Sequence, residues 1–166
     1  EIQRLIALRA RTWLLRLRTL LALHCQRAGE RRWRIHLNPV LRTTKRYGYS
    51  NILITREPDL GAQFWALCIE EGIALDQAMS ALKVIGRNEH LVKLLRHSSP
   101  AVRARAVHAL AAIGDETTIP TLAEVLTSEK DAGVRNCLEK VLDQLEAQPP
   151  PRLRVTMLGE FSATRG

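Results

Sequence analysis

Residues 99–114, SPAVRARAVHALAAIG, and residues 131–145, DAGVRNCLEKVLDQL, decide the fold of this chain. The Val-Arg pair of the first stretch returns in the second at an offset of 32 residues. Leu91 returns as Leu122 at an offset of 31, so the extra residue falls in a turn, where insertions are tolerated. The period predicts two tandem helical hairpins over residues 88–147.

The ends of the predicted helices carry appropriate capping residues. Ser99 and Asp131 each stand three residues before the Val-Arg pair, where a side-chain oxygen can accept a free helix N–H. Pro100 suits a first helical position because its missing N–H has no partner to lose there. Gly114 suits the residue after a helix. Each hairpin has one apolar face that it cannot bury alone, so the two must stack on each other.

Residues 50–87 predict another helical hairpin on the N-terminal side of this pair. Asp59 can cap a helix that runs to Gly72. A second helix is expected from Asp76 to Gly86. This hairpin would supply the neighbour that the first repeat needs.

Residues 1–49 predict a basic hairpin that is similar to a tetratricopeptide-type unit. Its first helix has two apolar stripes at helical spacing. The stripes contain Leu5, Leu8, Thr12, Leu15 and Thr19, and Leu14, Leu17, Leu21 and Cys25. Pro39 is expected to interrupt or start the second helix. Trp13, Trp33 and Trp65 are expected in the core.

Positive charge is concentrated in the first third of the chain. Residues 1–50 hold twelve Lys/Arg and two acidic residues, a net +10, whereas residues 51–166 hold thirteen and fifteen, a net −2. Such a patch can attract nucleic acid or an acidic protein surface, or it can be a solvated helix face. Arg11 and Arg18, seven residues apart, are candidate partner contacts.

Three arginines of the tandem pair are further candidates for partner binding. Arg103, Arg105 and Arg135 could line the concave surface through which repeat proteins bind partners. The alternative for Arg103 and Arg135 is a structural role, in which each bonds to backbone or to acidic residues between adjacent repeats.

No catalytic, cofactor or metal motif occurs. The chain has no P-loop, no GxGxxG and no CxxC. His90, His97 and His108 could in principle share a metal, but satisfied or exposed imidazoles are the expected interpretation. We therefore expect no enzyme activity, no cofactor and no metal. The three cysteines fit small buried residues of a reducing compartment, and no apolar run reaches the roughly 20 residues that span a bilayer. A cytoplasmic location without membrane contact is expected.

The C-terminal part changes character. Residues 148–152 contain three consecutive prolines and predict a stiff linker. Leu153, Val155 and Met157 then alternate with polar residues, which is typical of a half-buried strand. A β-containing domain is expected to begin at residues 153–166.

Two resemblances carry these patterns further. Ser-Ser-Pro-Ala-Val-Arg, Ala-Leu-Ala-Ala-Ile-Gly-Asp and Asp-Ala-Gly-Val-Arg, all within residues 88–146, resemble the short HEAT-like repeats of bacterial lyase-type and adaptor proteins. The stretch from Leu153 to Phe161 resembles the opening strand of the OmpR-type winged helix in bacterial transcriptional activators. In these regulators helical repeats join a signalling NTPase of the STAND type to a DNA-binding domain with a bacterial transcriptional activator module (BTAD).

The sequence as a whole predicts an all-α solenoid of helical hairpins, TPR-like and then HEAT-like, with a short C-terminal β-strand segment. The second resemblance implies a non-catalytic connector between a sensor or NTPase portion and a winged helix beyond Gly166, which would contact DNA. Protein or intramolecular domains are the expected partners. The alternative is a stand-alone HEAT adaptor, or a lyase-like chaperone that presents a concave surface to a protein client.

Overall fold

The computed structural model describes residues 2–47, 53, 56–114, 116–147, 153–158 and 160–165. Its helices form four successive hairpins in chain order. They are α1 (Ile2–Arg27), α2 (Trp33–Tyr47), α3 (Pro58–Glu71), α4 (Leu75–Ile85), α5 (Glu89–Leu94), α6 (Pro100–Ile113), α7 (Ile119–Ser128) and α8 (Ala132–Glu146), with the 3-10 turn η2 (Glu116–Thr118) before α7.

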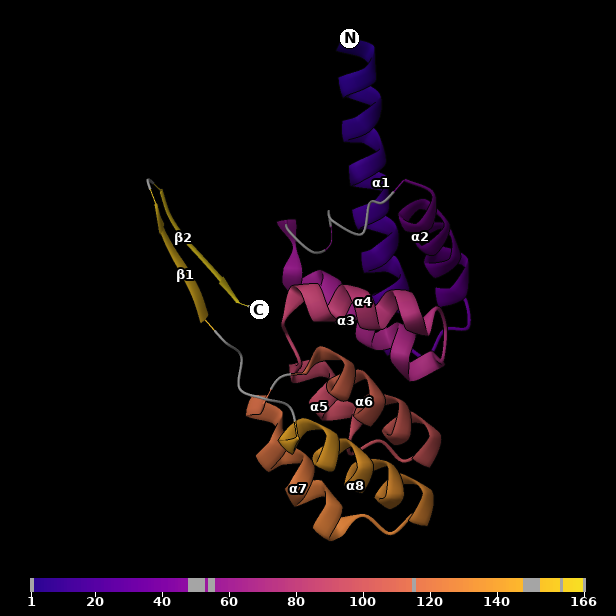
Figure 1. The fold of residues 1–166 in the computed structure, drawn as a ribbon. Helices are drawn as coiled ribbons and strands as arrows, with labels where there is room; N and C mark the ends of the chain where they lie inside the picture. Colours follow the sequence, from indigo (N-terminus) through magenta and orange to yellow (C-terminus); the bar gives the residue numbers. More distant parts are fainter. Residues whose placement is uncertain are drawn as a thin grey trace.

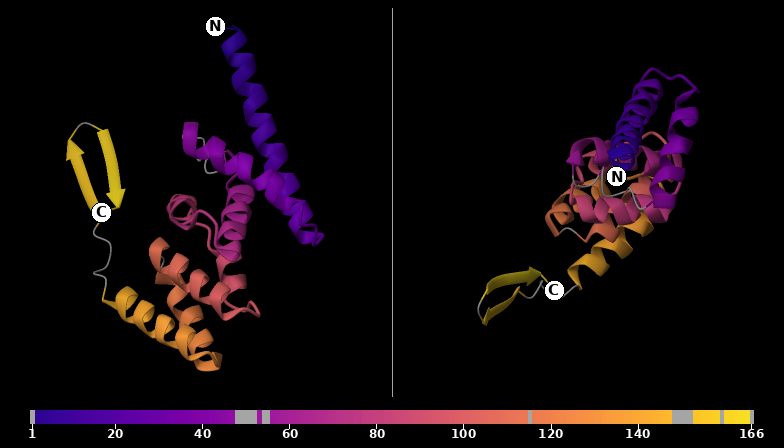
Figure 2. Two further views of the ribbon diagram at one scale, coloured as in Figure 1. Left: turned by 90° about the vertical axis from the view of Figure 1, so that its right-hand side faces the viewer. Right: turned by 90° about the horizontal axis from the view of Figure 1, so that it is seen from above.

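The hairpins stack into a solenoid-like array, as expected from the sequence (Figure 1). The second helices of three successive hairpins pack one on the next, in the order α4, α6 and α8. The first helices α1, α3 and α5 also contact each other in chain order. The N-terminal part of α1 extends away from the other helices, as both Figure 1 and Figure 2 show. An all-α repeat fold is therefore confirmed for the helical part.

The apolar faces predicted for the tandem pair are buried. Val102 and Val134, at equivalent positions of the two repeats, are 6% and 2% exposed. The further members of the two faces that are buried are Ala106, Ala109 and Leu110 in α6 and Leu138, Val141, Leu142 and Leu145 in α8. Leu91 and Leu122 of the preceding helices are also fully buried. The stack thus has a continuous core from one repeat to the next.

The helix ends follow the predicted capping in part. Gly114 takes the left-handed conformation at φ 68°, and Pro100 stands in the first turn of α6. The Asp131 side chain accepts from the Val134 N–H at 3.0 Å, so this cap is confirmed. Ser99 occupies the cap position, but its hydroxyl makes no cap bond; the Ser99 N–H instead donates to Nδ1 of His97 at 3.0 Å. The prediction of a Ser99 side-chain cap was wrong, although the backbone at Ser99 (φ −80°, ψ 122°) is close to that at Asp131 (φ −77°, ψ 122°). The difference between the two caps therefore lies in their side chains and not in the course of the loop.

The second hairpin differs from its prediction at the start of α3. Pro58 begins the helix, so Asp59 lies within its first turn and does not cap it. The Asp59 carboxylate pairs with Arg87, which follows α4. Gly72 and Gly86 end α3 and α4 in the left-handed conformation as expected. α4 starts at Leu75, one residue before the predicted start, so Asp76 lies in its first turn.

The first hairpin departs most from its prediction. α2 runs through Pro39, so the proline neither starts nor interrupts the helix. Of the two stripes on α1, Leu15 and Thr19 are buried, whereas Leu14 and Leu17 are half exposed. The prediction that the tryptophans lie in the core is confirmed for Trp33 and Trp65 but not for Trp13. The similarity of this hairpin to tetratricopeptide units stays a prediction.

Trp13 was wrongly expected in the core, and it is 66% exposed. The buried side of α1 faces α2 and α3. Trp13 lies on the other side, where the described residues supply no covering helix.

Beyond α8 the chain forms β1 (Leu153–Leu158) and β2 (Glu160–Arg165), an antiparallel pair. The proline-rich linker, residues 148–152, lies outside the described residues. That the strands open a larger β-containing domain stays a prediction. None of the helices in the described part of the chain combines the length and apolar character that crossing a bilayer requires.

Gly61 in α3 allows the backbone of Leu53 to approach the helix closely, and a substitution can test this contact. A Cβ at this position would overlap the carbonyl oxygen of Leu53, which is itself buried. In an open helix Gly61→Ala would stabilise by about 1 kcal/mol. We expect the opposite sign, a loss of about 1–3 kcal/mol from overpacking. Urea denaturation of both proteins measures the change, and a more stable variant would contradict the close approach.

Candidate functional site

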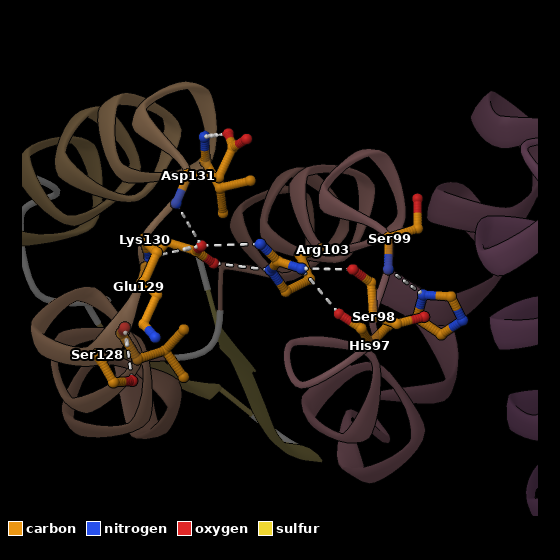
Figure 3. Close-up of polar contacts among 10 residues, drawn as sticks. His97, Ser98, Ser99, Arg103, Ser128, Glu129, Lys130 and Asp131 are labelled. Atoms are coloured by element: carbon orange, nitrogen blue, oxygen red, sulfur yellow. Dashed lines mark hydrogen bonds and ion pairs between the residues drawn. The ribbon is translucent and has the colours of Figure 1, made fainter.

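The clearest polar constellation lies between the two HEAT-like repeats and centres on Arg103 of α6 (Figure 3). Its Nε and Nη2 donate to the two carboxylate oxygens of Glu129 at 2.7 and 2.8 Å. Its Nη1 donates to the carbonyls of His97 at 2.9 Å and Ser98 at 3.1 Å. One guanidinium therefore joins the α5–α6 loop of its own repeat to the α7–α8 loop of the next.

Glu129 accepts from both sides of this junction. Besides Arg103, its Oε1 accepts the backbone N–H groups of Lys130 at 2.9 Å and Asp131 at 2.8 Å. The hydrogen bond from Arg103 is the largest of the effects that lower the pKa of Glu129 to about 2, and the backbone N–H groups add to it. The Glu129 side chain is 4% exposed and that of Arg103 is 15% exposed. Little solvent screens this bidentate pair, so it is stronger than an ordinary surface ion pair.

Arg105, on the same helix, forms a comparable tie to the previous hairpin. Its Nε donates to the Ile69 carbonyl at 2.7 Å, and its Nη2 donates to the Glu70 carbonyl. Both carbonyls lie at the C-terminal end of α3, where the last carbonyls of a helix lack intrahelical partners. A cation there also complements the helix dipole. α6 is thus held to both of its neighbours by arginine.

The structure separates the five arginines that the sequence singled out. Arg103 and Arg105 donate to acceptors within the chain. Arg103 therefore has the structural role that the sequence offered as the alternative to partner binding. Arg135, the counterpart of Arg103, is exposed, and no described residue pairs with its side chain. Arg11 and Arg18 lie apart from this junction, beside a hollow between α1 and α2 of about 230 Å³. Their role in binding a partner stays a prediction.

A shallow groove of about 380 Å³ lies against the Arg103–Glu129 pair. Leu95 and Val125 form its apolar part. Its rim carries Arg96 and Lys130, and Glu124 faces Arg96 at 3.6 Å. The groove is suited to contact with a polypeptide, because it combines apolar surface with charged groups of both signs.

The titratable groups of the repeats do not converge on one point. Nε2 of His97 lies 3.8 Å from Oε1 of Glu70, and burial raises the pKa of that carboxyl. Sγ of Cys137 lies 3.3 Å from Nε2 of His108, with the pKa of the thiol raised mainly by burial. A raised pKa keeps the sulfur protonated and poorly nucleophilic. Among the described residues no group of three or more His, Cys, Asp or Glu could hold a metal ion.

Sequence reasoning missed Glu129 as the partner of Arg103. Glu129 stands two residues before the cap Asp131, but the equivalent position of the first repeat holds His97. A search for repeated residues therefore passes over it. A search for one acidic residue within reach of the recurring arginine would have found it.

Comparison with known proteins supports the repeats. The family model of HEAT repeats matches residues 77–143. The match covers α4 only in part, most of α8 and the helices between them. Comparisons with curated proteins and with solved structures gave no match. Helical repeats of the HEAT kind are thus supported for this part of the chain, and such repeats typically act as scaffolds that bind proteins.

The Arg103–Glu129 pair should be a major contributor to stability. In Glu129→Gln the amide NH2 must face at least one of the N–H donors, so a hydrogen bond is lost and the guanidinium is left uncompensated. We expect the free energy of unfolding to fall by about 2–4 kcal/mol. Glu124→Gln, which breaks the exposed pair with Arg96, is the matched control and should cost under about 0.5 kcal/mol. Equal losses of unfolding free energy in the two variants would contradict the larger contribution of the buried pair.

The same pair predicts a pH dependence. The folded pKa of Glu129, about 2, lies below its ordinary value of 4.5. Its contribution is therefore complete above about pH 4.5 and is lost as pH falls toward 2. The difference in unfolding free energy between the unmodified chain and Glu129→Gln should shrink over that interval. A difference that stays constant down to about pH 2.5 would contradict the low pKa.

Proposed function

We propose that this chain is a non-catalytic helical-repeat scaffold that binds a protein partner. The observation that carries the proposal is the stack itself: successive hairpins share one core, and α6 is fixed to both neighbours through Arg103 and Arg105. A rigid stack offers an extended surface with a constant shape, which is what repeat proteins use for recognition. The match to HEAT repeats supports the same role.

Within that role, we infer that the chain connects two parts of a bacterial transcriptional regulator. Support comes from the order of the segments: helical repeats, three prolines, and then residues 153–161, which resemble the start of an OmpR-type winged helix. In this mechanism the stack transmits the state of a sensor or NTPase portion by biasing the position of the DNA-binding domain. DNA is contacted by the winged helix and not by the repeats.

Arg135 fits this connector role. Its counterpart Arg103 receives a carboxylate from the following hairpin, whereas Arg135 faces outward from the last repeat. We propose that the segment that packs against α8 supplies an acidic residue, which pairs with the Arg135 side chain. Cytoplasmic location follows from the proposed role.

The alternative is a stand-alone adaptor or a lyase-like chaperone, which the match to HEAT repeats suits equally well. In that case the groove beside Glu129 and Lys130 would receive a segment of a client protein.

The open reading frame that encodes the chain distinguishes the two. The connector role predicts a winged-helix sequence of about 80 residues after Gly166, within the size range of a small domain. A stop codon directly after Gly166 would exclude the connector and leave the adaptor. If the winged helix is present, hydrogen exchange should show slower amide exchange in α8 of the whole protein than in residues 1–166 alone. Unchanged exchange would show that nothing packs against α8.

A further inference from the structure

α1 is apolar on two opposite sides. One side, with Leu15, Thr19 and Ala22, is buried against the rest of the molecule. The other side carries Trp13, Leu14, Leu17 and Leu20, which are 66%, 50%, 53% and 45% exposed. We call these four residues the α1 stripe. A helix that is apolar on two sides normally packs against partners on both, and here only one side is covered.

The α1 stripe leads into a groove between α1 and the start of α3. Leu20 belongs to both, and Leu23 and Leu60 add further apolar surface to the groove. The groove has a volume of about 660 Å³. A ridge of exposed apolar side chains that continues into a groove with both apolar and charged lining is a more specific feature than isolated surface leucines.

The charges around this surface favour an acidic partner. The acidic residues of the groove are already occupied, since Glu57 pairs with Arg16 at 2.9 Å and Asp59 pairs with Arg87. Arg56 is exposed at the rim. Arg27 donates to the neutral amide oxygen of Gln63 at 2.6 Å. Within the described part of the chain, neither Arg27 nor Arg56 forms an ion pair with a carboxylate.

The opposite flank of the α1 stripe is also basic. Arg11 and Arg18 lie beside Leu14, at the hollow between α1 and α2. Residues 1–50 as a whole carry a net +10. Basic side chains thus border the α1 stripe on both sides.

We propose that the α1 stripe and its groove bind an amphipathic α-helix of a partner protein, whose apolar face is flanked by Asp and Glu. The proposal rests on the scaffold role proposed above. Trp13, Leu17 and Leu20 are spaced by four and three residues, so they form a straight ridge about 10 Å long at 1.5 Å per residue. Such a ridge packs along a second helix, with anchor side chains at the same helical spacing.

Two other occupants fit less well. A second copy of this chain would bring its own arginines against these, and like charges facing each other disfavour the pairing. Nucleic acid would be attracted by the charge, but phosphates and sugars do not cover the exposed leucines of the α1 stripe. An acidic amphipathic helix satisfies both the charge and the apolar surface.

The test uses the full 166-residue chain and a synthetic peptide of about 18 residues, long enough for five helical turns. The peptide has Leu at positions i, i+3, i+4 and i+7 and Glu on both flanks, and a control peptide has Lys in place of each Glu. Trp33 and Trp65 are buried already, so a blue shift of tryptophan emission on binding reports on Trp13. Fluorescence anisotropy gives the affinity. We expect saturable binding of the Glu peptide with a blue shift, and weaker binding at high salt.

The double substitution Trp13→Ala/Leu17→Ala should lower the affinity for the Glu peptide by about tenfold or more. Ile35→Ala/Val84→Ala is the matched control, because these side chains are 67% and 69% exposed but lie on α2 and α4. It should leave the affinity unchanged. Circular dichroism melting checks that both variants fold. If the Trp13→Ala/Leu17→Ala variant does not fold, Leu17→Gln takes its place.

Four results would overturn the proposal: equal binding of the Lys peptide, equal affinity of the double variant, self-association of the chain through the α1 stripe, or no saturable binding of the peptide. Binding of duplex DNA or of phosphatidylglycerol vesicles that depends on Trp13 and Leu17, without peptide binding, would assign the surface to those partners instead. None of these results bears on the connector role, which the reading frame tests.

Discussion

A hairpin of two short helices has more apolar surface than it can bury between its own helices, and this constraint organises the whole stack. Leu110 and Leu142 are buried because α6 packs against both α4 and α8. Each hairpin therefore supplies part of its neighbour's core, and stability is shared between adjacent units. α5 illustrates the point: it has only six residues, which is too short for an independent helix, yet Leu91 within it is fully buried.

Apolar stacking alone does not fix how far one hairpin slides along the next. The arginines of α6 supply that information, because a planar guanidinium accepts its partners only in a defined geometry. Arg105 aligns α6 with the end of α3, and Arg103 aligns the two loops on either side of the repeat junction. The cost of desolvating Glu129 is offset by its two backbone donors and by the bidentate pair. Directional contacts thus set the register that the core leaves free.

The repeated part of the fold was predictable from sequence, and the first hairpin was less so. Repetition gives two independent examples of each position, so the caps and the buried face of α6 and α8 could be identified from a single chain. Asp131 caps its helix as expected, but the Ser99 hydroxyl does not cap α6, and the Ser99 N–H bonds to His97. His97 and Glu129 stand at equivalent positions but are different residue types, so comparison of the two repeats does not reveal the contacts of either. Contacts made by residues that do not recur are determined by tertiary geometry, which one sequence does not display.

The first hairpin shows a different limit of sequence patterns. Spacing identifies an apolar stripe but not whether anything covers it, so the stripe with Leu14 and Leu17 and the stripe with Leu15 and Thr19 look alike in the sequence. The structure buries Leu15 and Thr19, whereas Leu14 and Leu17 are half exposed. At the other end of the stack, Arg135 is exposed where Arg103 is bridged. The two ends therefore offer different chemistry. The N-terminal end presents apolar surface with a basic border, and the C-terminal end presents the exposed guanidinium of Arg135. A scaffold with unlike ends can join two different neighbours in a fixed order, which is what a connector requires.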